Sequence, residues 1–354
     1  MPDVLTLDDV AALLQPGMTV FVQGSIGQPT AILAALSRSA PSVEGVHFVS
    51  PLTPGLNGFP FDPGNERNRL TTFFDYPGLR ESWKAGAIDF VPLHYSEILP
   101  WLRGNGRLDL AIITASQPDA AGKCSTGLAA DFVPDILPHC DAVLAQCNAS
   151  MPQMANAPTL HADSFDYIVH ADQPLKDMDK PVGDATSQAV ARNVAKLVRD
   201  GDTIQYGVGR LPQLAVAGLT GKRDLGLHTG LASPVMRDLV ESGAVTGRAK
   251  SRDQGRHVTG AVCGTQDFYD WCAARDDIEL RSVTYTHDVE VLGSIDNLVA
   301  INSALEVDLF GQANAEMAGS RQISATGGLV DFLRGAPRSR YGRSIICLPS
   351  TRAG

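Results

Sequence analysis

The 354-residue sequence lacks several features that mark particular classes of protein. Its first residues, Met1 to Val4, include neither a basic start nor an apolar run of signal-peptide length, and no later stretch is apolar over the length of a membrane span. Basic residues are in deficit, with 29 Lys and Arg against 39 Asp and Glu and a formal net charge of -10. We therefore expect a soluble, cytoplasmic protein whose partner is neither a nucleic acid nor a membrane.

Patterned cysteines are absent as well. The six cysteines form no C-x-x-C pair and have no histidine at zinc-ligand spacing. We expect reduced, mostly buried thiols, and neither disulfides nor a structural metal. The 44% of hydrophobic residues and the chain length are sufficient for two compact cores.

Short apolar runs alternate with helical patterns along the whole chain. This alternation is typical of α/β proteins built on parallel sheets. The strand-like runs are 20–22, 90–93, 111–113, 143–144 and 167–169, and the helical patterns include 30–36 and 184–198. A further helix near the start has Thr6 as its predicted N-cap and Gly17 as its end.

Two segments of the first half recur in the second half at nearly the same offset. The repeated pieces are 17–20 with 201–204, the glycine turns around Gly24 and Ser25 with those around Gly207 and Gly209, Pro29 with Pro212, and 111–122 with 300–311. Such an echo indicates a duplicated domain. We expect two similar open α/β domains, 1–180 and 181–354, whose glycine-rich turns face a shared ligand cleft.

Six segments carry specific motifs in a fixed order over nearly the entire chain. They are 90–98 (Phe-Val-Pro-Leu-His-Tyr-Ser-Glu-Ile), 118–125, 151–152, 201–212, 300–312 and 327–332. Together they resemble the butyrate/4-hydroxybutyrate CoA-transferase branch of the acetyl-CoA hydrolase/transferase family, the class I CoA-transferases. The resemblance implies an enzyme that moves CoA between an acyl-CoA thioester and a small carboxylate. Coenzyme A would be a substrate, with no tightly bound cofactor, and the protein would be a homodimer or larger homo-oligomer.

The resemblance also implies roles for individual residues. In such enzymes a glutamate attacks the thioester and carries first the acyl group and then CoA, while backbone N–H groups stabilise the oxyanion. Carried over by motif, the donors come from Val208 or Gly209 and from Gly327 or Gly328, and Asn302 contacts the thioester. Gly207, Gly24 and Ser25 are further expected CoA-binding positions.

One departure from the family pattern changes the expected chemistry. The family's glutamate follows a His-Thr pair, but this chain has Gly230 after His228 and Thr229, with Pro234-Val235 in place of Asp-Gly. Glycine has no side chain to acylate. Water, activated by Glu306, is then an alternative nucleophile toward a CoA thioester or an activated C–C bond of a CoA-linked substrate. A non-catalytic CoA-binding paralogue is the third possibility.

Several residues admit two interpretations at this stage. Asn302 either binds ligand or satisfies a buried backbone group, and His228 is either structural or an acid or base. The arginines at 334, 338, 340 and 343 either meet the CoA phosphates or form a solvated loop. Cys263, Cys272 and Cys347 are expected to be inert core thiols. The chain stops at Gly354 inside a family segment, so the second domain is expected to be incomplete.

Overall fold

The computed structural model describes residues 1–39, 43–59, 68–75 and 77–351. Contacts divide the chain into two compact units. The first comprises Met1–Leu93, Glu97–Lys176 and Ile323–Ala325, and the second comprises His94–Ser96, Asp177–Gln322 and Thr326–Gly354. Residues 352–354, at the expected early end of the second domain, lie outside the described residues.

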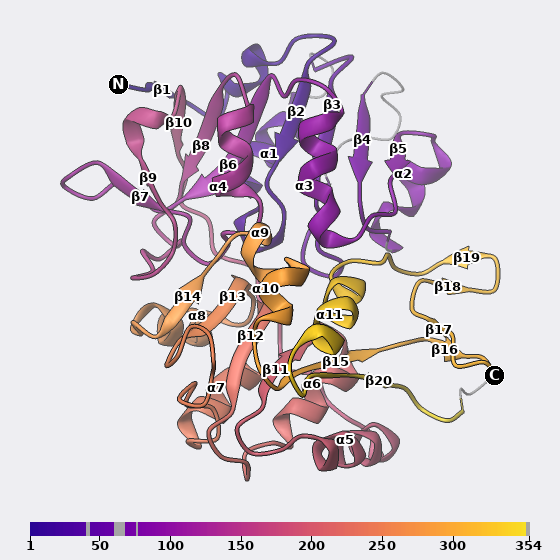
Figure 1. The fold of residues 1–354 in the computed structure, drawn as a ribbon. Coiled ribbons are helices and arrows are strands. Elements are labelled where there is room, and N and C mark those ends of the chain that lie inside the picture. Colours follow the sequence, from indigo (N-terminus) through magenta and orange to yellow (C-terminus); the bar gives the residue numbers. More distant parts are fainter. Residues whose placement is uncertain (40–42, 60–67, 76, 352–354) are drawn as a thin grey trace. The chain divides into compact units, whose positions relative to one another are not determined.

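The first unit is built on an eight-stranded sheet in which every pairing is parallel (Figure 1). In spatial order the strands are β1 (Asp3–Leu5), β10 (Tyr167–His170), β8 (Val143–Cys147), β6 (Leu110–Ala115), β2 (Thr19–Val22), β3 (His47–Ser50), β4 (Arg69–Thr72) and β5 (Ile88–Phe90). The central strand β6 is buried along its whole length, as expected for a parallel sheet covered on both faces. Val20, Phe48 and Ile112 belong to its core.

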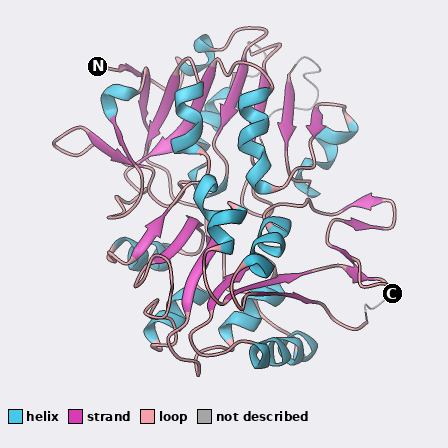
Figure 2. Ribbon diagram, viewed as in Figure 1, coloured by secondary structure: helices cyan, strands magenta, loops and turns pink. Residues whose placement is uncertain are grey.

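Helices of the first unit lie beside the strands of its sheet (Figure 2). They are α1 (Thr30–Arg38), α2 (Arg80–Lys84), α3 (Tyr95–Gly104, whose first two residues belong to the second unit) and α4 (Val133–Ile136), and β7 (Lys123–Ser125) pairs with β9 (Thr159–His161) in a separate ribbon. The helix predicted near the start is only a 3₁₀ turn, Val10–Leu13. Its capping differs from the expectation, because the Asp9 carboxylate accepts bonds from the amide and hydroxyl of Thr6.

The second unit contains a six-stranded sheet that is also parallel throughout. Its order is β14 (Ile278–Leu280), β13 (His257–Val262), β12 (Gly226–Ala232), β11 (Thr203–Tyr206), β15 (Leu298–Ser303) and β20 (Arg343–Cys347). The order β5-β4-β3-β2-β6-β8 in the first unit is the same arrangement of successive strands. The predicted α/β class with parallel sheets is therefore confirmed.

Helices alternate with strands along most of the second unit. They are α5 (Ala185–Leu197), α6 (Arg210–Ala217), α7 (Val235–Glu241), α8 (Gln266–Ala273), α9 (Val283–Thr286), α10 (Val289–Gly293) and α11 (Leu329–Gly335). The predicted helix at 184–198 is α5, and Asp184 caps it by accepting a 2.7 Å bond from the Ser187 amide. Two short ribbons complete the unit: β16 (Glu306–Val307) with β17 (Ala313–Asn314), and β18 (Met317–Ala318) with β19 (Arg321–Gln322).

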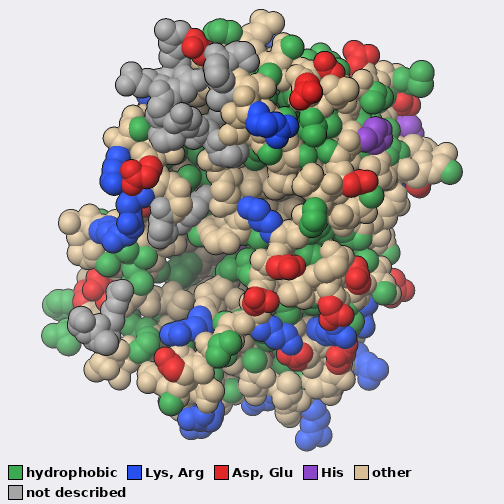
Figure 3. Space-filling view, turned by 180° about the vertical axis from the view of Figure 1, so that it is seen from behind, with side chains coloured by type: hydrophobic (Ala, Val, Ile, Leu, Met, Phe, Trp, Pro, Cys, Tyr) green, Lys and Arg blue, Asp and Glu red, His purple; other side chains and the backbone are tan. Residues whose placement is uncertain are grey.

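Charged side chains of both signs are interspersed on the face of the molecule that Figure 3 shows. Within the described ranges, no helix has the length and apolar character needed to cross a bilayer.

Two of the four arginines singled out above are held in ion pairs: Arg338 with Glu290, and Arg343 with Asp202.

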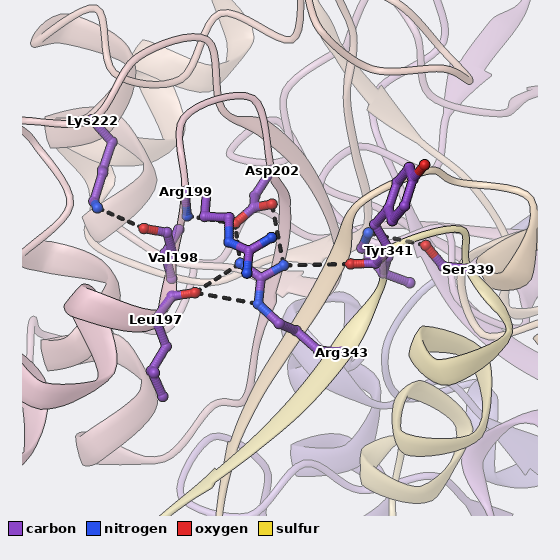
Figure 4. A network of polar contacts seen from close by, with 9 residues as sticks. Leu197, Val198, Arg199, Asp202, Lys222, Ser339, Tyr341 and Arg343 are labelled. Atoms are coloured by element: carbon purple, nitrogen blue, oxygen red, sulfur yellow. Dashed lines mark hydrogen bonds and ion pairs between the residues drawn. The ribbon is translucent and has the colours of Figure 1, made fainter.

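The Arg343 pair anchors the outer strand β20 to the sheet (Figure 4). Asp202 stands immediately before β11 and its side chain is only 3% exposed. Its carboxylate accepts bonds from the Arg343 guanidinium and, at 2.6 Å, from the Arg199 amide. Arg343 also donates to the Leu197 carbonyl at 2.7 Å. Arg343 is therefore committed to packing within this unit.

Candidate functional site

Gly230 lies in the carboxyl half of β12. The strand pairs with β13 on either side of this glycine, at Thr229 with Thr259 and at Leu231 with Ala261. Its bonds to β11 are confined to the first two residues of β12, Gly226 and Leu227. The hydroxyl of Thr229 instead donates to the Tyr206 carbonyl, at 3.2 Å. This end of β12 is where parallel sheets usually present ligand-binding groups.

The imidazole of His287 lies against the position that a side chain at residue 230 would occupy. A Cβ at Gly230 would lie 2.7 Å from both Cε1 and Nε2 of that ring. A Cβ at Gly328 would lie 2.6 Å from the same Nε2. Real Cβ atoms do not approach so closely, so two glycines are needed to accommodate one histidine.

His287 is held by aromatic neighbours and is only 4% exposed. It directly follows α9, and its ring centroid lies 4.6 Å from that of Tyr95 and 4.9 Å from that of Phe332. Nδ1 is 2.9 Å from the Thr286 hydroxyl. The ring therefore has little freedom to turn away from Gly230.

His228 contacts the backbone of the residue before His287. It is fully buried in β12, and its Nε2 lies 3.1 Å from the Thr286 carbonyl, to which it donates. Burial, reinforced by the charge of Lys250, lowers the pKa of His228 to about 3. Burial and the neighbouring His228 lower the pKa of His287 to about 3 as well. Both rings are therefore neutral at physiological pH.

This pair of buried histidines predicts a loss of stability in mild acid. Their folded pKa values lie below the unfolded value of about 6.5, so the unfolded chain binds more protons below that pH, and the stability contributed by the neutral rings falls as the pH drops from about 6.5 toward 3. We expect the free energy of unfolding to decrease by about 2 to 3 kcal/mol between pH 7.5 and 5.5. Urea denaturation at both pH values measures this change, and His228→Gln should reduce it. A free energy that is the same at both pH values would contradict it.

The turn after β11 has the features expected of a backbone anion site. The Gly207 amide donates to the Ile301 carbonyl at 2.9 Å, whereas the N–H groups of Val208 and Gly209 donate no hydrogen bond within the described residues. Val208 is 42% exposed, and Gly209 stands at the start of α6. A Cβ at Gly207 would lie 2.7 Å from the Asn302 Oδ1, so glycine is required for this close approach.

Asn302 faces a neighbouring amide on the adjacent strand. Its Nδ2 donates to the Gln205 Oε1 at 2.9 Å, and the Gln205 Nε2 lies 3.4 Å from the Asn302 Oδ1. Asn302 is 4% exposed. This reciprocal pair accounts for much of its hydrogen-bonding capacity and positions it beside Gly207.

Gly327 and Gly328 lie just before α11, the helix that carries Phe332. The Gly327 carbonyl accepts a 3.0 Å bond from the Tyr95 amide, and Gly327 has a positive φ of 51° that suits glycine. Gly328 precedes the first residue of α11. Below them, the Asp331 carboxylate accepts bonds from the amide and hydroxyl of Ser96, at 3.1 and 2.7 Å. These bonds fix residues 95–96 against α11.

Glu306 lies away from this cluster, in the exposed ribbon strand β16. Its carboxylate accepts a 2.6 Å bond from the Asn314 side chain. Within the described residues, no hydrogen bond joins Glu306 to the groups around His287.

Gly24 and Ser25 occupy the corresponding turn of the first unit. A Cβ at Gly24 would lie 2.1 Å from the Pro51 carbonyl oxygen. Ser25 has a positive φ of 56°, and its backbone is held by the Asn57 side chain through bonds of 2.8 and 2.7 Å. This turn is tightly specified by packing and hydrogen bonds.

The thiols considered as substitute nucleophiles are buried, as predicted. Burial raises the pKa of Cys272 to about 12 and that of Cys347 to about 11, and Cys263 is fully buried. Within the described residues, no group of three or more His, Cys, Asp or Glu side chains is arranged to hold a metal ion.

The sequence analysis missed His287, Tyr95 and Phe332 as neighbours of Gly230. His287 was not considered there, and residues 94–98 and 327–332 entered only as family motifs. The sequence around Thr286 and His287 carries no local signal that indicates which strand the ring contacts.

Comparison with known proteins places the chain in a family. The model of the acetyl-CoA hydrolase/transferase N-terminal domain matches residues 3–177, and that of the C-terminal domain matches residues 264–354. The 4-hydroxybutyrate coenzyme A transferase of Clostridium kluyveri is 31% identical over 98% of this chain and 81% of that protein. An acetyl-CoA hydrolase of Neurospora crassa is 23% identical over 94% of this chain and 66% of that protein.

Solved structures agree with this placement. RipA from Yersinia pestis matches with a TM-score of 0.92 and 28% identity, covering 99% of this chain and 82% of RipA. A 4-hydroxybutyrate CoA-transferase from Porphyromonas gingivalis matches with a TM-score of 0.80 and 27% identity, over 97% of this chain and 80% of that one. The chain therefore belongs to the acetyl-CoA hydrolase/transferase family.

Proposed function

We propose that this protein is an acyl-CoA-processing enzyme that releases CoA from a thioester by attack of water. The observation that carries this proposal is the environment of Gly230. The atoms nearest to a Cβ at this position belong to His287 and Phe332, and neither residue is a carboxylate. A route through an acyl-glutamate has no glutamate here, whereas hydrolysis needs only a held water and a stabilised oxyanion.

Backbone donors of the second unit suit the second requirement. The N–H groups of Val208, Gly209 and Gly328 donate no hydrogen bond within the described part of the chain. Gly207, Gly24, Ser25, Asn302 and Gly327 complete the proposed CoA-binding set. Coenzyme A is proposed as a substrate, not as a resident cofactor. Glu306 is a weaker candidate for the base, since it lies in the exposed ribbon and is bonded to Asn314.

A second candidate is CoA transfer to a carboxylate. It is favoured by the name of the relative described above, the 4-hydroxybutyrate coenzyme A transferase of Clostridium kluyveri. This route requires a nucleophile other than residue 230, or direct attack by the acceptor carboxylate on the thioester.

Product analysis separates the candidates. The purified protein is incubated with acetyl-, butyryl- and succinyl-CoA, with and without acetate, butyrate or succinate, and the CoA species are identified by mass spectrometry. Free CoA at a rate independent of the carboxylate supports hydrolysis. New acyl-CoA that appears only with a carboxylate supports transfer. Saturable binding of CoA without turnover supports a non-catalytic paralogue and contradicts both.

We further propose two similar domains at 1–180 and 181–354 in a cytoplasmic homodimer or larger homo-oligomer. The matching strand orders support the domains, and the free cysteines suit a reducing compartment.

The proposed assembly is supported by two exposed apolar side chains. At the turn between β16 and β17, Leu309 and Phe310 are 104% and 91% exposed, and contact with a partner would remove this apolar surface from water. Light scattering should give at least twice the chain mass, and Leu309→Ser with Phe310→Ser should lower it. A parent protein of single-chain mass would contradict the assembly.

A further inference from the structure

The contacts of His287 determine which of its ring nitrogens carries the proton. The Thr286 hydroxyl has one proton and donates it to the Ser282 carbonyl, at 3.2 Å. Its oxygen is then an acceptor toward Nδ1, 2.9 Å away. A neutral imidazole carries one proton, so Nδ1 is protonated and Nε2 presents a lone pair.

That lone pair lies where the side chains of two other residues would be. Nε2 is 2.7 Å from the Cβ position of Gly230 and 2.6 Å from that of Gly328. Because both residues are glycines, no side chain of theirs covers the nitrogen. Tyr95 and Phe332 fix the plane of the ring.

We propose that Nε2 of His287 is the general base for the attacking water, an inference that rests on the proposed hydrolysis. Nε2 takes one proton from water while the water oxygen bonds to the thioester carbonyl carbon. The tetrahedral oxyanion then reforms the carbonyl, the C–S bond breaks, and the imidazolium returns its proton to the CoA sulfur. The products are a carboxylic acid, which ionises in solution, and free CoA.

The surroundings suit a base that begins and ends neutral. Thr286, a neutral hydroxyl, stands behind the ring where a carboxylate would favour the imidazolium. His228 holds the Thr286 backbone through its carbonyl, 58 positions away in the sequence, and so positions the base from the strand that carries Gly230. Burial keeps the pKa of His287 low and the free ring unprotonated. The free ring is therefore neutral and can accept the proton of the attacking water, and the imidazolium that forms is acidic enough to protonate the thiolate sulfur as the C–S bond breaks.

The test compares two buried histidines of the same unit. His287→Gln keeps a polar side chain of similar length, and His257→Gln is the matched control, because His257 is 2% exposed on β13 and its ring faces Asp277 at 3.5 Å. We expect His287→Gln to lower the kcat for CoA release by about 10²- to 10⁴-fold, with the KM for acyl-CoA within about threefold of the parent. The kcat of His257→Gln should stay close to the parent value.

A second variant covers the case in which His287→Gln folds poorly. In His287→Ala, free imidazole added to the assay should restore part of the lost rate, which a purely structural ring would not allow. A His287→Gln variant with parental kcat, or a folded but inactive His287→Ala that imidazole does not rescue, would overturn the assignment. A parent protein that hydrolyses no thioester would instead show that the proposed function itself is wrong.

Discussion

Gly230→Glu alone is expected to destabilise the protein and to give no CoA transfer, whereas the double variant Gly230→Glu with His287→Ala should form an acyl-enzyme. The new Cβ would lie 2.7 Å from the His287 ring, and the ring is wedged between Tyr95 and Phe332. Overpacking of this kind costs about 1 to 3 kcal/mol. Removing the imidazole opens the volume that the glutamate side chain needs.

Three measurements on the same set of variants test this expectation. The Tm should be lower for Gly230→Glu than for the parent and should partly recover in the double variant. Such a recovery would show that the two positions are energetically coupled. Intact-protein mass spectrometry after incubation with acyl-CoA should detect the covalent adduct only in the double variant, and product analysis should find transfer there. Gly221→Glu is the control for adding a carboxylate, because nothing lies within 4 Å of a Cβ at Gly221. CoA transfer by Gly230→Glu alone, in a protein as stable as Gly221→Glu, would contradict the account.

Asp202→Asn is expected to be among the most destabilising single substitutions in the second unit. The carboxylate is 3% exposed and is bonded to the Arg343 guanidinium and the Arg199 amide. Losing its charge leaves a partly buried arginine without its counterion, a change that costs about 3 to 5 kcal/mol in buried pairs. We expect about 3 kcal/mol, because Arg343 is 24% exposed and keeps the Leu197 carbonyl.

Urea denaturation of Asp202→Asn, with a variant of an exposed ion pair as the control, tests the expected loss of stability. Glu81→Gln is the control: Glu81 and Lys84 pair at 2.7 Å with side chains 75% and 65% exposed, so the free energy of unfolding should hardly change. Asp202→Asn should also expose β20 to proteolysis before the rest of the sheet, since Arg343 begins that strand. Equal stability of the two variants would show that the buried pair contributes nothing.

Much of the fold was accessible from the sequence because local signals agreed with tertiary burial. The helix predicted at 184–198 formed as α5, capped by Asp184, and the apolar runs at 20–22, 111–113 and 143–144 lie inside parallel strands. The run at 90–93 was only partly right, since β5 ends at Phe90 and Pro92 follows before α3 begins at Tyr95. The first helix is only a 3₁₀ turn, which places Val10 and Leu14 in the core of the first unit.

The candidate site was less predictable, because its defining contact joins residues far apart in the sequence. Gly230 stood out only through the family resemblance, and nothing local showed that His287 would fill the space beside it. The amide pair of Asn302 with Gln205 likewise depends on the register of β11 and β15. Side-chain packing of this kind is decided by tertiary structure and has no periodic signature.

The origin of the oxygen in the released acid tests the central claim most directly. The purified protein is given acyl-CoA in H₂¹⁸O without any added carboxylate, and the products are examined by mass spectrometry. Direct attack of water predicts stoichiometric free CoA and one ¹⁸O atom in each carboxylate, formed at a rate that depends on His287. An absence of turnover until a carboxylate acceptor is supplied, followed by formation of its CoA thioester, would contradict the account.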